Sequence, residues 1–202
     1  MQRYKRLLAI TSLVATANIV LSQSKAREPG TKQAAPESAS DIHEMLLTEE
    51  GLLAFDTPKG WVRSDGRGLA SFVPKGSGAK TAAAAIYISS APIGSDQTDK
   101  TSSDYVQSDI AAFKARFERA IVHQEQPIFL PASQVSVPLY TFRSGEEHNT
   151  VEQVAYIQDT TQRVLTVVLS AKTEEAFSKS LPAFQTFVKS FRGSITPNHA
   201  NK

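Results

Sequence analysis

Apolar side chains gather in short runs along the middle of the chain, and each run ends at turn-forming residues. Such runs are typical of β-strands, which are bounded by glycine, proline and small polar residues. They predict strands at residues 52–55, 61–64, 69–73, 82–90, 126–130, 135–143, 150–158 and 163–171. Pro138 lies inside one run and indicates an edge strand or a bulge. The run Arg163 to Ala171 is apolar on both faces, which predicts a central strand covered on both sides.

Two other segments repeat their apolar residues at intervals of three and four, the spacing of one face of a helix. The first is predicted over 103–120, and its stripe is Val106, Ile110, Phe113 and Phe117. The second begins near Thr173, and its stripe is Phe177, Leu181, Phe184, Val188 and Phe191. Helical spacing favours a core position for these phenylalanines. Pro182 predicts a kink or two abutting helices in the second segment.

The order of elements is strands, helix, strands, helix, with hairpin connections between the strands. This order predicts an α+β fold, an α/β/α sandwich whose largely antiparallel sheet has helices on both faces. The folded domain is expected to span residues 41–193 and to open with a short helical turn at 41–50. Residues 27–40 are predicted to be a disordered linker and residues 194–202 a disordered tail, because both are polar and lack any apolar period.

The first 26 residues have the plan of a secretory signal peptide. Arg3, Lys5 and Arg6 precede an apolar run of 15 residues, Leu7 to Leu21, which is short for a membrane span of about 20 residues. Small residues offer cleavage after Ala17 or after Ala26. A buried N-terminal helix is the alternative, and the absence of acidic residues before Glu28 argues against it. The sequence therefore predicts an exported, periplasmic or secreted protein with no stable membrane anchor after cleavage.

Removal of this leader after Ala26 changes the charge of the chain. The basic residues fall from 22 to 18 against 20 acidic ones, a net charge of about −2. A nucleic-acid-binding face needs a basic excess, so nucleic acid is not an expected partner. The chain has no cysteine, which excludes disulfide bonds, thiol chemistry and the acylated cysteine that anchors bacterial lipoproteins.

Two stretches make the chain similar to the PsbP-like superfamily (PsbP/DcrB type) over residues 50–192. One is the opening run Phe55 to Trp61; the other is the closing strand 163–171 with the segments 173–177 and 189–191. Members include photosystem II subunits and assembly factors, DcrB-type envelope proteins and a Ran-binding protein. The resemblance implies an α/β/α sandwich that binds or assists other proteins without catalysis. Plant and cyanobacterial members commonly bind metal ions, but no ligand set or other functional residue of the family maps onto this sequence.

The loop Gly76-Ser77-Gly78-Ala79-Lys80-Thr81 superficially resembles a phosphate-binding loop. That motif needs adjacent Gly and Lys, an earlier glycine five residues before, and a strand-to-helix context. Ala79 separates glycine from lysine and position 73 is valine, so a hairpin loop is the favoured interpretation. Serine catalysis has no local signature either, because Ser71 lacks the second glycine of a Gly-x-Ser-x-Gly elbow.

The imidazole and acidic residues leave weaker possibilities. The histidines are His43, His123, His148 and His199, and a triad built from distant segments stays open. Glu146-Glu147-His148 is the densest cluster of possible metal ligands, but consecutive loop residues favour a solvated turn over a metal site. Trp61 is either core or interface. No catalytic, cofactor or metal residue is therefore assigned, and no cofactor is expected.

These observations favour a non-catalytic binding or assembly-assisting domain of the cell envelope. Its partner would be another envelope or extracytoplasmic protein, met through a sheet edge or a helix face; the oligomeric state stays open. The alternatives are an exported hydrolase with a site built from scattered residues, and a carrier of lipid or another small ligand.

The leader gives the first test. N-terminal sequencing of the exported protein is expected to begin at Asn18 or Arg27, after removal of the basic and apolar segment. An intact Met1 on the exported protein would contradict the predicted cleavage.

Overall fold

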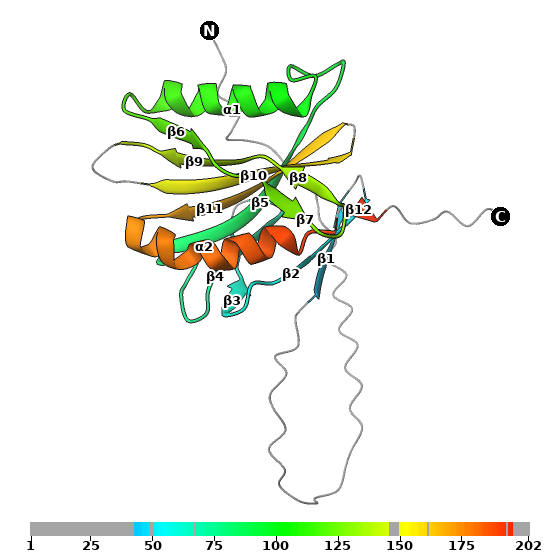
Figure 1. Ribbon diagram of the computed structural model, residues 1–202. Helices are drawn as coiled ribbons and strands as arrows, with labels where there is room; N and C mark the ends of the chain where they lie inside the picture. Colours follow the sequence, from blue (N-terminus) through cyan, green and yellow to red (C-terminus); the bar gives the residue numbers. More distant parts are fainter. Residues whose placement is uncertain are drawn as a thin grey trace, which may run out of the picture. The chain divides into compact units, whose positions relative to one another are not determined.

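The computed structural model describes residues 43–48, 51–66, 68–145, 150–160, 162–192 and 194–195. The predicted leader, linker and tail, apart from Ser194 and Ile195, lie outside these residues. The helices are α1 (Ser102–Arg116) and α2 (Glu174–Lys189) (Figure 1). The strands are β1 (His43–Thr48), β2 (Gly51–Asp56), β3 (Trp61–Arg63), β4 (Ala70–Pro74), β5 (Ala84–Pro92), β6 (Ile121–Gln124), β7 (Ile128–Leu130), β8 (Val135–Val137), β9 (Leu139–Arg143), β10 (Val151–Thr160), β11 (Arg163–Ala171) and β12 (Ser194–Ile195).

Seven strands form the main sheet, in the order β3-β4-β5-β11-β10-β9-β6, and every pairing is antiparallel. The strand β11 occupies the middle of this order, as its two-sided apolar pattern predicts. A smaller sheet has the order β1-β2-β12, and β7 pairs with β8 in a separate hairpin. The predicted α+β class with a largely antiparallel sheet is confirmed.

The two faces of the main sheet bury two separate sets of side chains. Alternate residues of β11 from Leu165 to Ala171 belong to the larger core with α2, whereas Val164 and Val168 belong to a second core with Val106 of α1. Successive side chains of a strand point to opposite faces, so the helices cover opposite faces of the sheet (Figure 1). The arrangement is the predicted α/β/α sandwich.

Four phenylalanines form a cluster in the larger core: Phe55 of β2, Phe72 of β4, Phe187 of α2, and Phe191 just after α2. The ring centroid of Phe55 lies 5.9 Å from that of Phe72, 5.2 Å from Phe187 and 6.4 Å from Phe191. Both Phe55 and Phe72 are fully buried. Aromatic pairs at these separations add to the stabilisation given by their burial. This phenylalanine cluster therefore joins the small sheet, the main sheet and α2.

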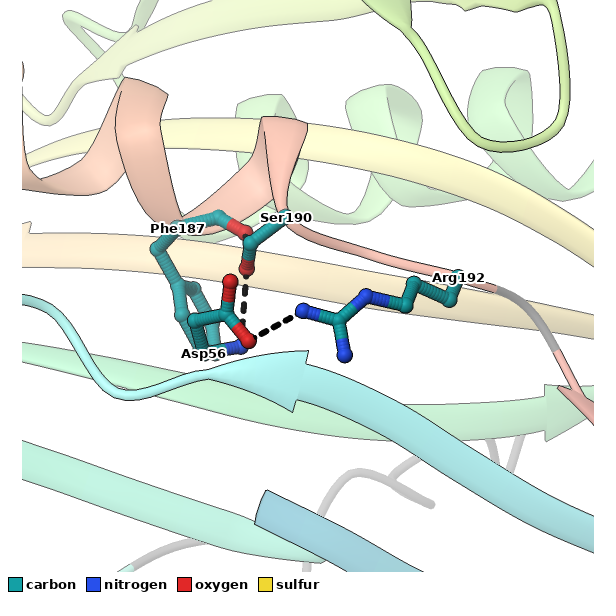
Figure 2. A network of polar contacts seen from close by, with 4 residues as sticks. All are labelled: Asp56, Phe187, Ser190 and Arg192. Atoms are coloured by element: carbon teal, nitrogen blue, oxygen red, sulfur yellow. Dashed lines mark hydrogen bonds and ion pairs between the residues drawn. The ribbon is translucent and has the colours of Figure 1, made fainter. Parts of the chain in front are cut away.

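Polar contacts close over the same junction (Figure 2). The backbone N–H of Asp56 donates to Oγ of Ser190 at 2.9 Å, and that hydroxyl donates to the carbonyl of Phe187 at 2.7 Å. The Arg192 guanidinium pairs with the Asp56 carboxylate. The opening and closing stretches that carry the family resemblance thus meet at one structural junction.

Both helix starts follow from their sequence. Thr101 and Asp104 form the predicted capping box, and the side chain of Thr173 caps α2 by accepting from the backbone N–H of Ala176. Because α1 ends at Arg116, Phe117 and the residues up to Ala120 lie beyond the helix, contrary to prediction. The helix α2 is a single helix through Pro182, so two abutting helices were wrong. Pro182 is exposed, and water can serve the carbonyl that its missing N–H leaves unbonded.

Two strands differ from the sequence expectations. The helical turn expected at 41–50 was wrong, because residues 43–48 form β1, paired along its full length with β2. The strand β6 was not predicted at all, since residues 121–124 lie between a predicted helix and a predicted strand. Pro138 lies between β8 and β9, where the ladder of β9 with β6 gives way to the separate hairpin of β7 and β8.

The phenylalanine cluster predicts the cost of a core truncation. Phe55→Ala is expected to lower the free energy of unfolding by about 3–5 kcal/mol, because it removes a fully buried ring from a close-packed junction. Urea unfolding followed by circular dichroism measures this difference.

Phe129→Ala is the matched control, because the Phe129 side chain is 48% exposed. Its expected cost is about 1 kcal/mol or less. Equal losses for the two variants would contradict the central position given to Phe55.

Candidate functional site

An open antiparallel sheet ends in two edge strands, and here these are β3 and β6. An edge strand carries backbone N–H and C=O groups that no neighbouring strand satisfies, so it can accept a strand from another chain. The two edges differ in what lies on and beside them.

The β3 edge carries charge and contacts the small sheet. Two hydrogen bonds, Lys75 N–H to the Gly60 carbonyl and Ser64 N–H to the Ser71 carbonyl, each 2.8 Å, show that the even-numbered backbone groups face β4. The backbone groups of Arg63 therefore point outward. The Arg63 guanidinium donates to Glu44 of β1 at 3.2 Å. Charged residues on an edge strand disfavour pairing with another strand, so this edge is guarded.

The four residues of β6, Ile-Val-His-Gln, carry no charged side chain, and Glu125 follows them. Three of its four residues, Ile121, His123 and Gln124, are exposed, and Ile121 is 59% exposed. An exposed β-branched residue on an uncharged edge is a feature that proteins usually avoid, because it favours strand addition. We therefore take β6 as the candidate functional site.

The hydrogen bonds to β9 identify which backbone groups of β6 are available. The N–H of Glu125 donates to the Leu139 carbonyl at 2.8 Å, so this pair is hydrogen-bonded. Hydrogen-bonded and non-hydrogen-bonded pairs alternate in an antiparallel ladder. His123 therefore bonds to β9, whereas Val122 and Gln124 direct their N–H and C=O groups outward. Within the described part of the chain, no hydrogen-bond partner faces these outward groups.

The side chains of β6 lie on both faces of the sheet. Val122 packs against the second core beneath α1, which holds the strand in place. On the opposite face, Ile121 lies across from Arg143 and His123 across from Thr141. The hydroxyl of Thr141 donates to the Glu125 carboxylate at 2.8 Å.

Arg143 extends this exposed row toward α2. Its Nε donates to the carboxylate of Glu174, the first residue of α2, at 2.9 Å. This hydrogen bond raises the pKa of Arg143 above its ordinary value, so the cation persists beside Ile121 at any physiological pH.

A close backbone approach fixes the chain just before β6. Gly145 follows β9 with a φ of +70°, and a Cβ there would lie 2.2 Å from the carbonyl oxygen of Arg119. Only glycine fits both the left-handed conformation and the contact. The turn leading to Ile121 is thereby held against the end of β9, which sets the register of the edge.

A buried carboxylate beneath α1 is the other polar feature of note. Asp109 is almost fully buried and accepts a 2.6 Å hydrogen bond from the hydroxyl of Tyr156 on β10. The Tyr156 ring lies 6.2 Å from that of Tyr105 and 6.0 Å from that of Tyr140. This buried network holds α1 on the sheet. Because Asp109 is enclosed, we interpret the network as structural and not as a binding site.

The residues singled out from the sequence do not converge on one place. His123 lies on β6, Ser71 is buried on β4, and Trp61 is half-buried against the larger core. His43 is the first residue of β1. The cluster Glu146-Glu147-His148 and the residue His199 lie outside the described residues.

The other candidates can be placed as well. The loop 76–81 connects β4 with β5, so a strand follows it, as the hairpin interpretation requires. Of the phenylalanines expected in the core, Phe177 and Phe184 are buried and Phe113 is partly buried against the second core. Phe117 is partly buried, with its ring centroid 4.9 Å from that of Phe113. Among the described residues, no group of three acidic or histidine side chains is placed to hold a metal ion. No helix within the described ranges is long and apolar enough to cross a membrane.

Sequence reasoning missed the features that define the edge. Ile121 and Val122 are a β-branched pair directly after the predicted helix 103–120, which is a weak strand signal. The outward backbone groups of Val122 and Gln124 have no sequence signal, because every residue type carries them except proline.

Comparison with known proteins finds similarity to solved structures. No family model and no curated protein matches the chain. Among solved structures, it is similar to cyanobacterial PsbP (CyanoP) from Synechocystis sp. PCC 6803, with 14% identity and a TM-score of 0.47 over 80% of this chain and 98% of that one. It is also similar to the Saccharomyces cerevisiae Ran-binding protein Mog1p, with 9% identity and a TM-score of 0.46 over 75% of this chain and 95% of the other. A PsbP protein and a Ran-binding protein are among the kinds of protein that the sequence resemblance named.

Gly145 provides a test of how the edge is positioned. Gly145→Ala is expected to destabilise the fold by about 2 kcal/mol or more, because a Cβ meets the Arg119 backbone and the left-handed conformation itself costs about 1–2 kcal/mol. Urea unfolding measures the loss, and faster amide exchange in β6 locates it.

Gly76→Ala is the control, since Gly76 has a φ of +86° with nothing within 4 Å of a Cβ. It carries the conformational cost alone. Equal effects from the two substitutions would show that the contact with Arg119 does not matter.

Proposed function

We propose that this chain is an exported, non-catalytic binding module that assists another protein of the cell envelope. The partner docks by adding an extended strand to β6. The observation that carries this proposal is the uncharged edge strand whose Val122 and Gln124 backbone groups point outward. Main-chain hydrogen bonds would supply affinity, and the exposed side chains Ile121 and His123 would supply selectivity.

Two features of the sequence support the proposed export. The basic and apolar start is the plan of a secretory leader, and the lack of cysteine suits a protein that works without disulfide bonds in an oxidising compartment. The polar stretch 27–40 would give the delivered domain a flexible tether with which to reach a partner.

The surroundings of His123 support binding over catalysis. A catalytic imidazole works beside a nucleophile and an orienting carboxylate, in a site that excludes water. His123 is instead exposed to solvent, and the Thr141 hydroxyl opposite it is taken up by a hydrogen bond to the Glu125 carboxylate. The larger core beside α2 consists of buried aliphatic and phenylalanine side chains packed together, which favours a binding surface over a ligand-carrying cavity.

A proline substitution isolates the backbone contribution of the edge. Gln124→Pro removes one outward N–H and places a ring where the added strand would lie, while the ladder to β9 does not use that N–H. Peptides selected from a phage-displayed library on the wild-type chain are expected to bind Gln124→Pro at least about tenfold more weakly, measured by fluorescence anisotropy.

Gln124→Ala is the matched control, because it changes the same side chain and keeps the backbone donor. Its affinity is expected to stay within about threefold of wild type, and thermal unfolding checks that both variants are folded. Undiminished peptide binding by a folded Gln124→Pro chain would refute strand addition at β6.

A further inference from the structure

The β6 edge is complementary to itself. Antiparallel pairing requires that outward N–H and C=O groups of one strand meet those of the other in alternating pairs. The two residues with outward groups, Val122 and Gln124, lie symmetrically on either side of His123. A twofold axis through His123 therefore brings Val122 of one copy opposite Gln124 of the second copy, and the reverse.

We propose that two copies of this chain pair through β6, antiparallel, about a twofold axis at His123. This inference rests on the proposed use of β6 as a strand-accepting edge, and it names the occupant of that edge when no other partner is present. Each Val122–Gln124 pair exchanges two hydrogen bonds, so the symmetric contact contains four. The two seven-stranded sheets become one continuous sheet.

The side chains of the edge are compatible with this register. His123 faces His123 of the second copy, and Ile121 faces Glu125 of the second copy. Ile121 then lies between Arg143 of its own copy and Glu125 of the second copy. The same arrangement repeats on the other side of the twofold axis, so each Ile121 has a positive and a negative side chain beside it. The symmetric register therefore covers the exposed Ile121 with the stem of Glu125 and places no lysine or arginine opposite another.

The opposite edge would not pair in the same way. Its outward backbone groups include those of Arg63, and the Arg63 side chain is bonded to Glu44 of β1. The corresponding twofold axis at Val62 would place Arg63 opposite Trp61 of the second copy, so the added strand would lie against a guanidinium already bonded to Glu44. A charged side chain on an edge strand disfavours pairing with another strand, so the choice between edges falls on β6.

The short contact makes the pairing weak and reversible. Only five residues, Ile121 to Glu125, take part, and such a contact buries far less than the roughly 1,200 Å² typical of stable complexes. A partner that contributes a longer strand would displace the second copy. Self-pairing would therefore cover the edge in the free protein and release it on binding.

The absence of cysteine from the chain allows a clean test by disulfide trapping. His123 would face its own copy in a non-hydrogen-bonded pair, whose Cα–Cα distance of about 4.5 Å suits a disulfide. Oxidised His123→Cys chains are expected to form a covalent dimer at least about tenfold more abundantly than Ile121→Cys chains. In the proposed register, two Ile121 residues are about 13 Å apart, beyond disulfide reach.

The register itself is tested by mixing two variants. Ile121→Cys and Glu125→Cys chains are expected to link to each other when mixed and not when oxidised alone, because the register places these positions opposite. Adding Gln124→Pro to the His123→Cys chain is expected to abolish the link.

The outcomes separate this inference from the proposed function. If His123→Cys chains link no better than Ile121→Cys chains while peptide binding still depends on Gln124, self-pairing is wrong and strand addition stands. If linking follows the register but peptides bind Gln124→Pro normally, self-pairing stands and the proposed use of β6 for partners is wrong. If neither depends on Gln124, both are wrong.

Discussion

The fold depends on the packing of Phe55 against Phe72, Phe187 and Phe191. This contact holds the small sheet and α2 on the main sheet, and the polar contacts of Asp56 with Ser190 and Arg192 close over it (Figure 2). Since β1 pairs with β2, fixing Phe55 also fixes β1, whose Glu44 bonds to Arg63 on β3. One edge of the main sheet is thereby guarded. The other edge, β6, is positioned by Gly145 and Val122 but keeps its outer side open, and the proposed function follows from this asymmetry.

The parts of the fold that sequence could predict are those with a strong local pattern. The stripes of α1 and α2 and the two-sided apolar run of β11 each fix an element from its own residues. The strands β1 and β6 could not be predicted, because their state is decided by pairing with β2 and β9. In β1, Met45 and Leu46 suited a helical turn equally well. Pro138 was informative, since a residue without an N–H marks where a ladder must break.

The candidate site was harder to predict than the fold. A sequence displays side chains with acid–base or nucleophilic chemistry, and His123 is among them as a possible catalytic base. The structure places His123 on an exposed edge, where the available groups are the backbone atoms of Val122 and Gln124. Backbone groups have no residue-type signature, so their availability emerges only when strand order and register are known. The sequence therefore predicted only in general terms that a partner would bind at a sheet edge or a helix face, and did not identify β6.

Amide hydrogen exchange of β6 in the full chain tests the central claim most directly. In dilute protein without a partner, the amides of His123 and Glu125 are expected to exchange slowly, because they bond to β9, and those of Val122 and Gln124 rapidly. Raising the protein concentration or adding a strand-forming peptide is expected to slow Val122 and Gln124 selectively. If these two amides are already protected in dilute protein, or stay unprotected when a peptide is bound, β6 is not an open edge that accepts a strand.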